Sequence, residues 1–246
     1  MRNETTFWNY PLAIMGLSLL LLISCKKSDS TKDPTPSSTT VTDVDGNVYH
    51  TVQIGSQTWM LENLKTTKYR NGDPIPTVTD DAIWKTLTTG AHCNYNNDAA
   101  TASKYGKIYN WYAVNDSRNI APTGWHVASD LEWSTLESFA AANLGTSGSV
   151  PKILATKTDW ASSTSAGAIG NDLTKNNSSG FSGLPGGSRF GLDGSYYAVG
   201  NLGTWWSSSV YDAINGWGRG LYYDYNTVDR SYIGKKTGCS VRCIKD

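Results

Sequence analysis

The last third of the chain is built from short segments rich in aromatic and β-branched residues, most of them separated by pairs that contain glycine. These segments are Phe181–Leu184, Ser188–Phe190, Ser195–Val199, Thr204–Val210, Trp217–Tyr223, Thr227–Tyr232 and Cys239–Ile244. Pairs such as Asp193-Gly194 and Asn215-Gly216 supply the positive φ angles that tight turns between antiparallel strands need. The pattern predicts short, twisted antiparallel strands joined by glycine-rich loops.

A second group of strands is expected earlier in the chain. Val41–Val44, Val48–Ile54 and Thr58–Leu61 are separated by Asp45-Gly46-Asn47 and by Gly55-Ser56-Gln57. Both separators are typical turn sequences. The three segments therefore predict a small antiparallel meander.

Helices are expected only in the middle of the chain. Ser129 and Glu132 have the spacing of a capping box, and Gly145 is a stop signal. The residues expected to form the buried face between them are Trp133, Leu136, Phe139 and Ala140. Shorter helices are predicted at Tyr105–Val114 and Pro151–Thr156. Strands and one to three helices thus occupy separate parts of the chain, which favours an α+β fold over alternating α/β.

The amino terminus has the features of an export signal. Leu12–Ile23 carries no charge, and a helix of that length spans about 18 Å, which is too short for a hydrocarbon core of about 30 Å. Leu22-Ile23-Ser24-Cys25 resembles the lipobox of bacterial lipoproteins, in which the cysteine is acylated and becomes the first residue. We therefore interpret residues 1–24 as a lipoprotein signal peptide. The alternative is an ordinary secreted protein with a chance cysteine.

A polar segment follows the predicted lipidation site at Cys25. Lys26–Thr40 contains no aromatic or large aliphatic residue, and such a segment cannot bury enough surface to offset its ordering entropy. We expect residues 25–40 to be the lipidated cysteine and a disordered linker, and residues 41–246 to be one folded domain. The expected location is the bacterial cell envelope, with the lipid anchor in the outer membrane, on either of its faces.

The charge balance excludes one class of partner. Lys plus Arg and Asp plus Glu both number 21, so the formal net charge is zero. Nucleic-acid-binding proteins carry a basic excess gathered on one surface. We therefore expect no nucleic-acid partner, and the composition leaves the oligomeric state open.

Several sequence words together resemble one family, the Fibrobacter succinogenes major paralogous domain, which is common in secreted and lipid-anchored proteins of that phylum and of Bacteroidetes. The words are Trp59–Leu64, Tyr105–Ala113, Gly124–Val127, Asp130–Trp133, Gly180–Gly187, Gly203–Ser209 and Ser240–Cys243. The resemblance implies one domain over residues 41–246. Its Trp-Trp-Ser-Ser and Val-Arg-Cys strands are more distantly similar to C-type-lectin-like folds, which include formylglycine-generating enzymes and bacterial variable binding proteins. The family implies no chemistry of its own.

The cysteines permit at most one disulfide in the domain. If Cys239–Ile244 is one strand, Cys239 and Cys243 lie about 13 Å apart, whereas a disulfide needs a Cα separation below about 7 Å. The resemblance favours a disulfide between Cys93 and Cys243, because cysteine is typical of the family at the position of Cys243. This chain departs from the family pattern at Ala121, where many members have cysteine, and at Cys239, where an aromatic residue is usual. No cleft rich in arginine or histidine accompanies Cys239, so we expect no catalysis by its thiol.

No other motif indicates catalysis or a metal. His50, His92 and His126 have no metal-ligand spacing. Gly180-Phe181-Ser182-Gly183 is one residue short of a nucleophile elbow. The residues Asp43, Asp45 and Asn47 begin like a calcium loop, but a strand follows, and Asn94–Asp98 lacks the acidic pattern. We expect no catalytic residues, no metal and no cofactor.

The candidate binding residues are polar aromatics and arginines near the carboxyl terminus. They are Arg219, Tyr222, Tyr223, Tyr225 and Arg230. Their mixture of flat rings and hydrogen-bonding groups suits a glycan or a protein surface. Trp205, Trp206 and Trp217 are interpreted as core. The predicted function is non-catalytic binding of a glycan or protein. The alternatives are a structural or assembly lipoprotein and an enzyme with a formylglycine-generating-like fold.

Overall fold

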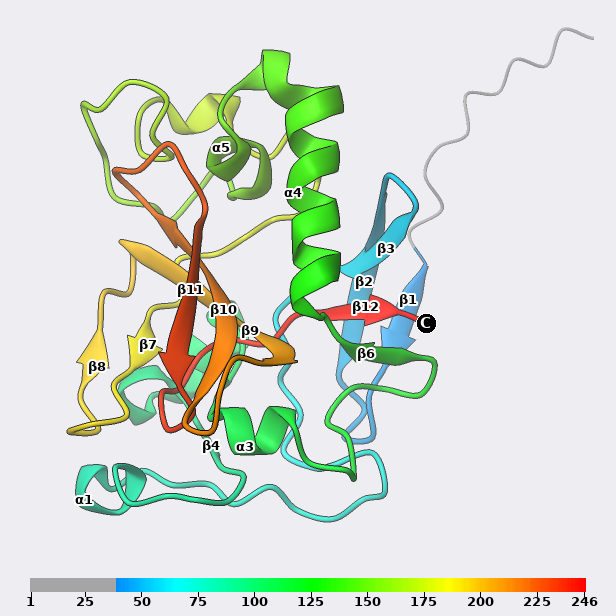
Figure 1. Ribbon diagram of the computed structural model, residues 1–246, viewed down its shortest axis with the longest axis vertical. Helices are drawn as coiled ribbons and strands as arrows, with labels where there is room; N and C mark the ends of the chain where they lie inside the picture. The colour runs from blue at the N-terminus through cyan, green and yellow to red at the C-terminus, as the bar shows by residue number, and fades with distance from the viewer. Residues whose placement is uncertain (1–38) are drawn as a thin grey trace, which may run out of the picture. The chain divides into compact units, whose positions relative to one another are not determined.

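A five-stranded antiparallel sheet joins the first and last strands of the computed structural model, which describes residues 39–246 (Figure 1). Its order is β1-β2-β3-β12-β6. The strands are β1 (Thr40–Thr42), β2 (Val48–Ile54), β3 (Gln57–Met60), β6 (Trp125–Val127) and β12 (Cys243–Lys245). The β1–β3 meander confirms the prediction. Ile244 pairs with both Trp59 and His126, so β12 ties together two distant parts of the chain.

The second sheet contains three antiparallel strands in the order β11-β10-β9. They are β9 (Leu202–Val210), β10 (Asn215–Tyr222) and β11 (Asp229–Gly234). Alternate residues of β10 are glycines, and this allows close packing on one face. A Cβ atom on Gly216 would lie 2.4 Å from the indole nitrogen of Trp111. The absence of a side chain there lets the Trp111 ring lie directly against the strand.

Two small two-stranded sheets are also present, one within the predicted strands Ser188–Phe190 and Ser195–Val199, the other involving a segment predicted to be helical. They pair β4 (His92–Cys93) with β5 (Ile108–Tyr109), and β7 (Ser188–Arg189) with β8 (Tyr196–Tyr197). The predicted helix Tyr105–Val114 was therefore wrong in its first part, where Ile108 and Tyr109 pair with β4. The helical part is the single turn α3 (Trp111–Val114), which Asn110 caps through its side chain. The predicted strand Phe181–Leu184 is also absent, because only Gly183 forms a bridge there.

The longest helix confirms its sequence signals. Helix α4 (Asp130–Leu144) begins with a complete capping box between Ser129 and Glu132. Gly145 does not end it in a left-handed turn but continues into the 3-10 turn η2 (Gly145–Ser147). The remaining helical elements are α1 (Asp81–Trp84), η1 (Tyr95–Asn97), α2 (Ala99–Tyr105), α5 (Val150–Leu154) and η3 (Leu173–Lys175). The observed fold is mixed helix and sheet, with few helices and curled antiparallel sheets.

Aromatic side chains fill the core beneath α4. Trp59, Trp133, Phe181 and Trp205 are all buried, and neighbouring rings among them have centroids 5.0–6.3 Å apart. Tilted and edge-on contacts at such distances are favourable for aromatic rings. Trp206 is also fully buried, in an adjoining cluster. The core interpretation of Trp205 and Trp206 is therefore confirmed, whereas Trp217 is only half-buried.

A buried arginine fixes β12 to the rest of the core. The guanidinium of Arg242 donates hydrogen bonds to the carbonyl oxygens of Met60 and Phe181, at 2.9 and 2.7 Å. It also donates to the side-chain oxygen of Asn63, which accepts a further bond from the Trp205 indole. Every one of these acceptors is uncharged. Burial accordingly lowers the pKa of Arg242 to about 9.

Candidate functional site

Four tyrosine side chains line a hollow of about 490 Å³ at the end of β10. Three of them, Tyr222, Tyr223 and Tyr225, were candidates from the sequence, and the structure brings them together. The complete lining is Tyr197, Ala198, Asn201, Leu202, Tyr222, Tyr223, Asp224 and Tyr225. We call this the tyrosine hollow.

Backbone hydrogen bonds hold the two loops that form the tyrosine hollow. The N–H of Tyr225 donates to the carbonyl of Tyr222, which closes the turn after β10. The N–H of Tyr223 donates at 2.9 Å to the carbonyl of Asn201, which joins that turn to the loop before β9. In that loop Ala198 has a φ of 63°, a conformation that non-glycine residues rarely adopt. The backbone of the hollow is therefore fixed by contacts that leave the side chains free.

The rings of the tyrosine hollow offer exposed apolar faces. Tyr225 is 51% exposed and Tyr197 is 49% exposed, while Tyr222 and Tyr223 are half-buried. The Tyr222 and Tyr225 rings lie 4.9 Å apart, and the Tyr197 ring packs 5.2 Å from that of Phe190. Neighbouring rings therefore support the exposed ones, and binding would require little further ordering of them.

The polar side-chain groups of the tyrosine hollow have no hydrogen-bond partner in the part of the chain that the structure describes. Within residues 39–246, no hydrogen bond or ion pair engages the four hydroxyls, the Asn201 amide or the Asp224 carboxylate. Burial, together with the nearby Asp229 carboxylate, raises the pKa of Tyr222, so its hydroxyl stays protonated. The lining contains no lysine, arginine or histidine. The hollow thus presents neutral hydroxyl and amide groups beside one negative charge.

The two candidate arginines do not belong to the tyrosine hollow. Arg219 is 1% exposed, and its guanidinium pairs with Asp130 at 2.7 Å and Glu137 at 2.5 Å, both on α4. Its prediction as a ligand-binding residue was wrong, because α4 covers the Arg219 side chain. Arg230 is more exposed, but it pairs with the same Asp130 and lies 3.7 Å above the centre of the Trp217 ring.

Sequence reasoning missed Tyr197 and Asn201. Tyr196 and Tyr197 are adjacent on β8 and point to opposite sides. The hydroxyl of Tyr196 donates a hydrogen bond to the side-chain oxygen of Asn97, whereas Tyr197 faces the hollow. The pair Tyr196-Tyr197 followed by Gly200-Asn201 was the available sign of an exposed aromatic loop. No feature of the nearby sequence predicts that this loop lies beside the turn after β10.

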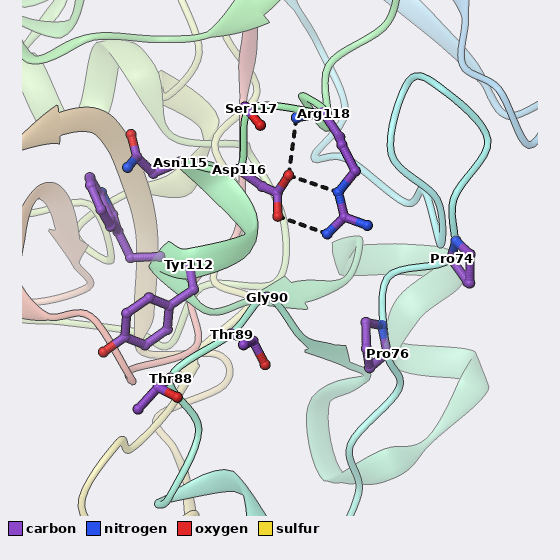
Figure 2. Close-up of a pocket in the computed structure, with 11 residues that line it drawn as sticks. Pro74, Pro76, Thr88, Thr89, Gly90, Tyr112, Asn115, Asp116, Ser117 and Arg118 are labelled. Carbon is purple, nitrogen blue, oxygen red and sulfur yellow. Dashed lines mark hydrogen bonds and ion pairs between the residues drawn. The ribbon is translucent and has the colours of Figure 1, made fainter.

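A second hollow of similar size, about 450 Å³, lies beside α3 (Figure 2). Figure 2 shows Arg118 directed at both carboxylate oxygens of Asp116. Arg118 also pairs with Asp73 at 3.2 Å. The bonds from Arg118 hold the pKa of Asp116 at about 2. We call this the Asp116–Arg118 hollow. Its charged groups are already bonded to each other.

The cysteines and histidines among residues 39–246 lie at separate places in the domain. Cys93, Cys239 and Cys243 are buried free thiols. The predicted Cys93–Cys243 disulfide is not formed, since Cys93 packs beside Trp84 in a cluster separate from that of Cys243. Burial raises the pKa of all three thiols, that of Cys243 to about 12. A buried thiol that stays protonated is a poor nucleophile.

The three histidines lie at separate places. His50 contacts Glu62, and His126 lies between Glu132 and Asp246. His92 is buried beside Thr77, and burial lowers its pKa to about 4. Among residues 39–246, no three histidine, cysteine or acidic side chains are grouped as metal ligands. None of the helices described there combines the length and apolar character needed to cross a bilayer.

Comparison with known proteins identifies one relationship. A sequence model of the Fibrobacter succinogenes major domain matches residues 52–245, from within β2 to the end of β12. The match includes every residue of the tyrosine hollow. No curated protein matches the chain, and no solved structure does. Cys25 lies outside both the matched region and the described residues.

Proposed function

The chain belongs to the Fibrobacter succinogenes major domain family, and we propose that it is a lipid-anchored protein of the bacterial cell envelope whose folded domain binds a glycan without catalysis. The tyrosine hollow is the observation that carries this proposal. Short curled antiparallel sheets with few helices further support a C-type-lectin-like architecture for the domain.

The chemistry of the tyrosine hollow suits a neutral sugar. Carbohydrates present an apolar C–H face and a rim of hydroxyls, which aromatic rings and polar side chains recognise respectively. Tyr197 and Tyr225 provide exposed rings, and Asn201 provides an unengaged amide. The only charged group in the lining is Asp224. A uronic acid or sulfated sugar would be repelled there, so the proposed ligand is neutral.

The absence of catalysis is supported by the placement of reactive groups. The three histidines lie apart from one another, and the thiols are buried in the core. Asp224 is a single carboxylate in its hollow, whereas general acid–base chemistry on a glycosidic bond uses a pair.

The lipid anchor is proposed from the sequence at Cys25. Acylation there would hold the domain at the outer membrane through the polar linker that follows. A Cys25→Ala variant should remain as an unacylated precursor and lose its membrane fractionation. Unchanged fractionation of that variant would refute the anchor.

The glycan proposal is tested by titration calorimetry with neutral oligosaccharides selected on a glycan array. The double variant Tyr222→Ala/Tyr225→Ala should bind at least about 10-fold more weakly, since each stacking contact contributes about 1 kcal/mol. Tyr232→Ala is the matched control, because Tyr232 is 60% exposed and lies outside the hollow. Equal affinity of the double variant and the wild type would refute the site. No glycan binding by the wild type would favour a protein ligand or a purely structural role.

A further inference from the structure

Strand β11 is the outer strand of the three-stranded sheet, and only one of its two edges is paired (Figure 1). Strand β10 lies along that edge, and no other strand among residues 39–246 pairs with β11. The strand contains no proline, and no bulge interrupts its pairing with β10. An edge strand of this kind presents a row of backbone N–H and C=O groups to which a strand of another chain can bind.

The backbone groups of two residues point outward from this edge. The N–H of Lys235 donates at 2.9 Å to the carbonyl of Ile214, and the register then continues without a shift along β11. In an antiparallel pair, residues that bond to the partner strand alternate with residues that do not. Ser231 therefore bonds to β10, whereas the N–H and C=O groups of Arg230 and Tyr232 point away from it. No hydrogen bond from elsewhere in the described chain engages these four outward groups.

The side chains of Arg230 and Tyr232 are held in exposed positions beside the same edge. Tyr232 is 60% exposed, and its ring stacks on that of Tyr211 with centroids 4.9 Å apart. The Arg230 guanidinium pairs with Asp130 and lies 3.7 Å above the centre of the Trp217 ring. Tyrosine, tryptophan and arginine are the residue types that contribute most to the stability of protein interfaces. The edge therefore combines free backbone groups with ordered side chains of interface type.

We propose that two copies of this chain pair through their β11 edges, so that the three-stranded sheets join into one continuous antiparallel sheet. A two-fold axis perpendicular to the sheet pairs identical strands antiparallel about a central residue. With Ser231 at the centre, Arg230 of each copy lies opposite Tyr232 of the other. The four outward groups of each strand are then hydrogen-bonded, and each guanidinium lies beside an aromatic ring, which is a favourable contact.

The neighbouring registers are less favourable. A pairing centred on Arg230 places the two guanidinium groups opposite each other, and like charges directly opposite are destabilising. A pairing centred on Tyr232 places Arg230 opposite Gly234, whose carbonyl already accepts the N–H of Thr237. The edge is therefore complementary to itself in one register, and this identifies the partner as a second copy.

The pairing leaves the tyrosine hollow uncovered. Leu202 of that hollow belongs to β9, which lies on the other side of β10 from β11. Dimerisation and glycan binding therefore use opposite edges of the same sheet, and each can be tested without the other.

Oppositely charged variants of Tyr232 test the dimer. Sedimentation velocity over a concentration series measures the dimer dissociation constant of the chain from residue 25 onward, with Cys25→Ser so that no acyl group contributes. Tyr232→Lys places an ammonium group opposite each Arg230 and should weaken dimerisation at least about 10-fold. Tyr232→Glu is the matched control at the same exposed position. It places a carboxylate opposite each Arg230 and should retain the dimer.

A disulfide cross-link tests the register. In the proposed dimer the two Ser231 residues face each other without backbone bonds, with Cα atoms about 4.5 Å apart, which is within disulfide distance. Ser231→Cys should therefore cross-link the dimer in oxidised glutathione. Asp229→Cys is the matched control and should not cross-link, because the two copies of Asp229 would lie roughly 14 Å apart.

Each outcome bears on the proposal. A wild-type chain that stays monomeric across the series, or equal dissociation constants for Tyr232→Lys and Tyr232→Glu, overturns it. So does cross-linking of Asp229→Cys without that of Ser231→Cys, because another register would then hold. Thermal unfolding equal to that of the wild type shows that each variant is folded. Calorimetry of Tyr232→Lys should give the wild-type glycan affinity, which distinguishes failure of the dimer from failure of the glycan site.

Discussion

The tyrosine hollow and the Asp116–Arg118 hollow have similar volumes, about 490 and 450 Å³, but their charged groups differ in whether they are engaged. In the Asp116–Arg118 hollow, Arg118 engages both oxygens of Asp116 and one oxygen of Asp73. In the tyrosine hollow the hydroxyls, the amide and the carboxylate have no partner among the described residues. A ligand that contacts the charged groups must displace existing bonds in the Asp116–Arg118 hollow but not in the tyrosine hollow. The unengaged carboxylate and the exposed rings, more than volume, therefore favour the tyrosine hollow as the candidate site.

Arg242 lies outside both hollows and is buried, with its guanidinium fully engaged in hydrogen bonds. Its removal should have the largest effect on the free energy of unfolding. Arg242→Met leaves the buried carbonyls of Met60 and Phe181 without donors. Each unsatisfied buried group costs about 1–3 kcal/mol, so a total loss of about 3–5 kcal/mol in unfolding free energy is expected. Urea denaturation measures it, with exposed Lys245→Met as the control. A loss below about 1 kcal/mol would show that these bonds are dispensable.

A variant of Arg219 tests whether this residue stabilises the fold without taking part in ligand binding. Arg219→Met leaves Glu137 without its partner and weakens the hold of β10 on α4. A loss of about 2–3 kcal/mol is expected, because breaking a buried ion pair exposes the remaining charge to an apolar environment. Glycan affinity of the folded variant should stay within about 2-fold of the wild type. A larger loss of affinity at full folding would return Arg219 to the binding site.

Features that depend on nearby residues could be predicted from the sequence, whereas those that depend on distant residues could not. The capping box at Ser129 and Glu132 was predictable, because both partners lie within one turn of α4. The exposure of Tyr225 was predictable from its polar turn, whereas Tyr222 and Tyr223 are half-buried. The burial of Arg219 was not, because its partner Glu137 lies 82 residues earlier in the chain.

The fold follows the same division between local and distant determinants. The β1–β3 meander depends on turns within the segment, and it was predicted with nearly correct bounds. Strand β5 looked helical because Ile108 and Trp111 have helical spacing, but pairing with β4 decides its conformation. Tyr197 joins the tyrosine hollow through tertiary contacts, among them the pairing of β8 with β7 and the bond from Tyr223 to Asn201. Such contacts arise from tertiary packing and leave no local pattern.

The Asp116–Arg118 hollow should affect stability modestly and glycan binding not at all. The Asp116 side chain is 20% exposed and that of Arg118 is 40% exposed, so solvent screens their pairing. Arg118→Ala is expected to cause only a small loss of unfolding free energy in urea denaturation, because the ion pair is solvent-exposed. Glycan affinity should remain within about 2-fold of the wild type. A 10-fold loss would mean that the engaged hollow also takes part in binding.

The same pair gives a pH prediction. Bonds from Arg118 hold the pKa of Asp116 at about 2, below its ordinary value of 3.8. The pair therefore stabilises the fold fully above about pH 4 and loses that contribution as the pH falls toward 2. Asp116→Asn should remove this part of the acid destabilisation. A wild-type and a variant curve that fall in parallel between pH 4 and 2 would contradict it.

The smallest expected effect concerns His126, which couples β6 to the start of α4. Its ring nitrogens lie 2.7 Å from an oxygen of Asp246 and 2.8 Å from one of Glu132. Burial alone lowers the pKa of His126, but the hydrogen bonds to Asp246 and Glu132 outweigh it and raise the pKa above 6.5. The protonated ring therefore stabilises the fold fully below pH 6.5, and this contribution is lost as the pH rises through the folded-state pKa.

Because the His126 side chain is 36% exposed, the contribution should be below about 1 kcal/mol. His126→Gln keeps a hydrogen-bonding side chain without the charge, so its unfolding free energy should lose this dependence between pH 6 and 8. His50→Gln is the matched control, since His50 contacts only Glu62 and is 55% exposed. Equal pH dependence of the unfolding free energy in the His126 variant and the wild type would show that protonation of the ring does not stabilise the contact between β6 and α4. Glycan affinity should not follow this titration, because the tyrosine hollow contains no histidine.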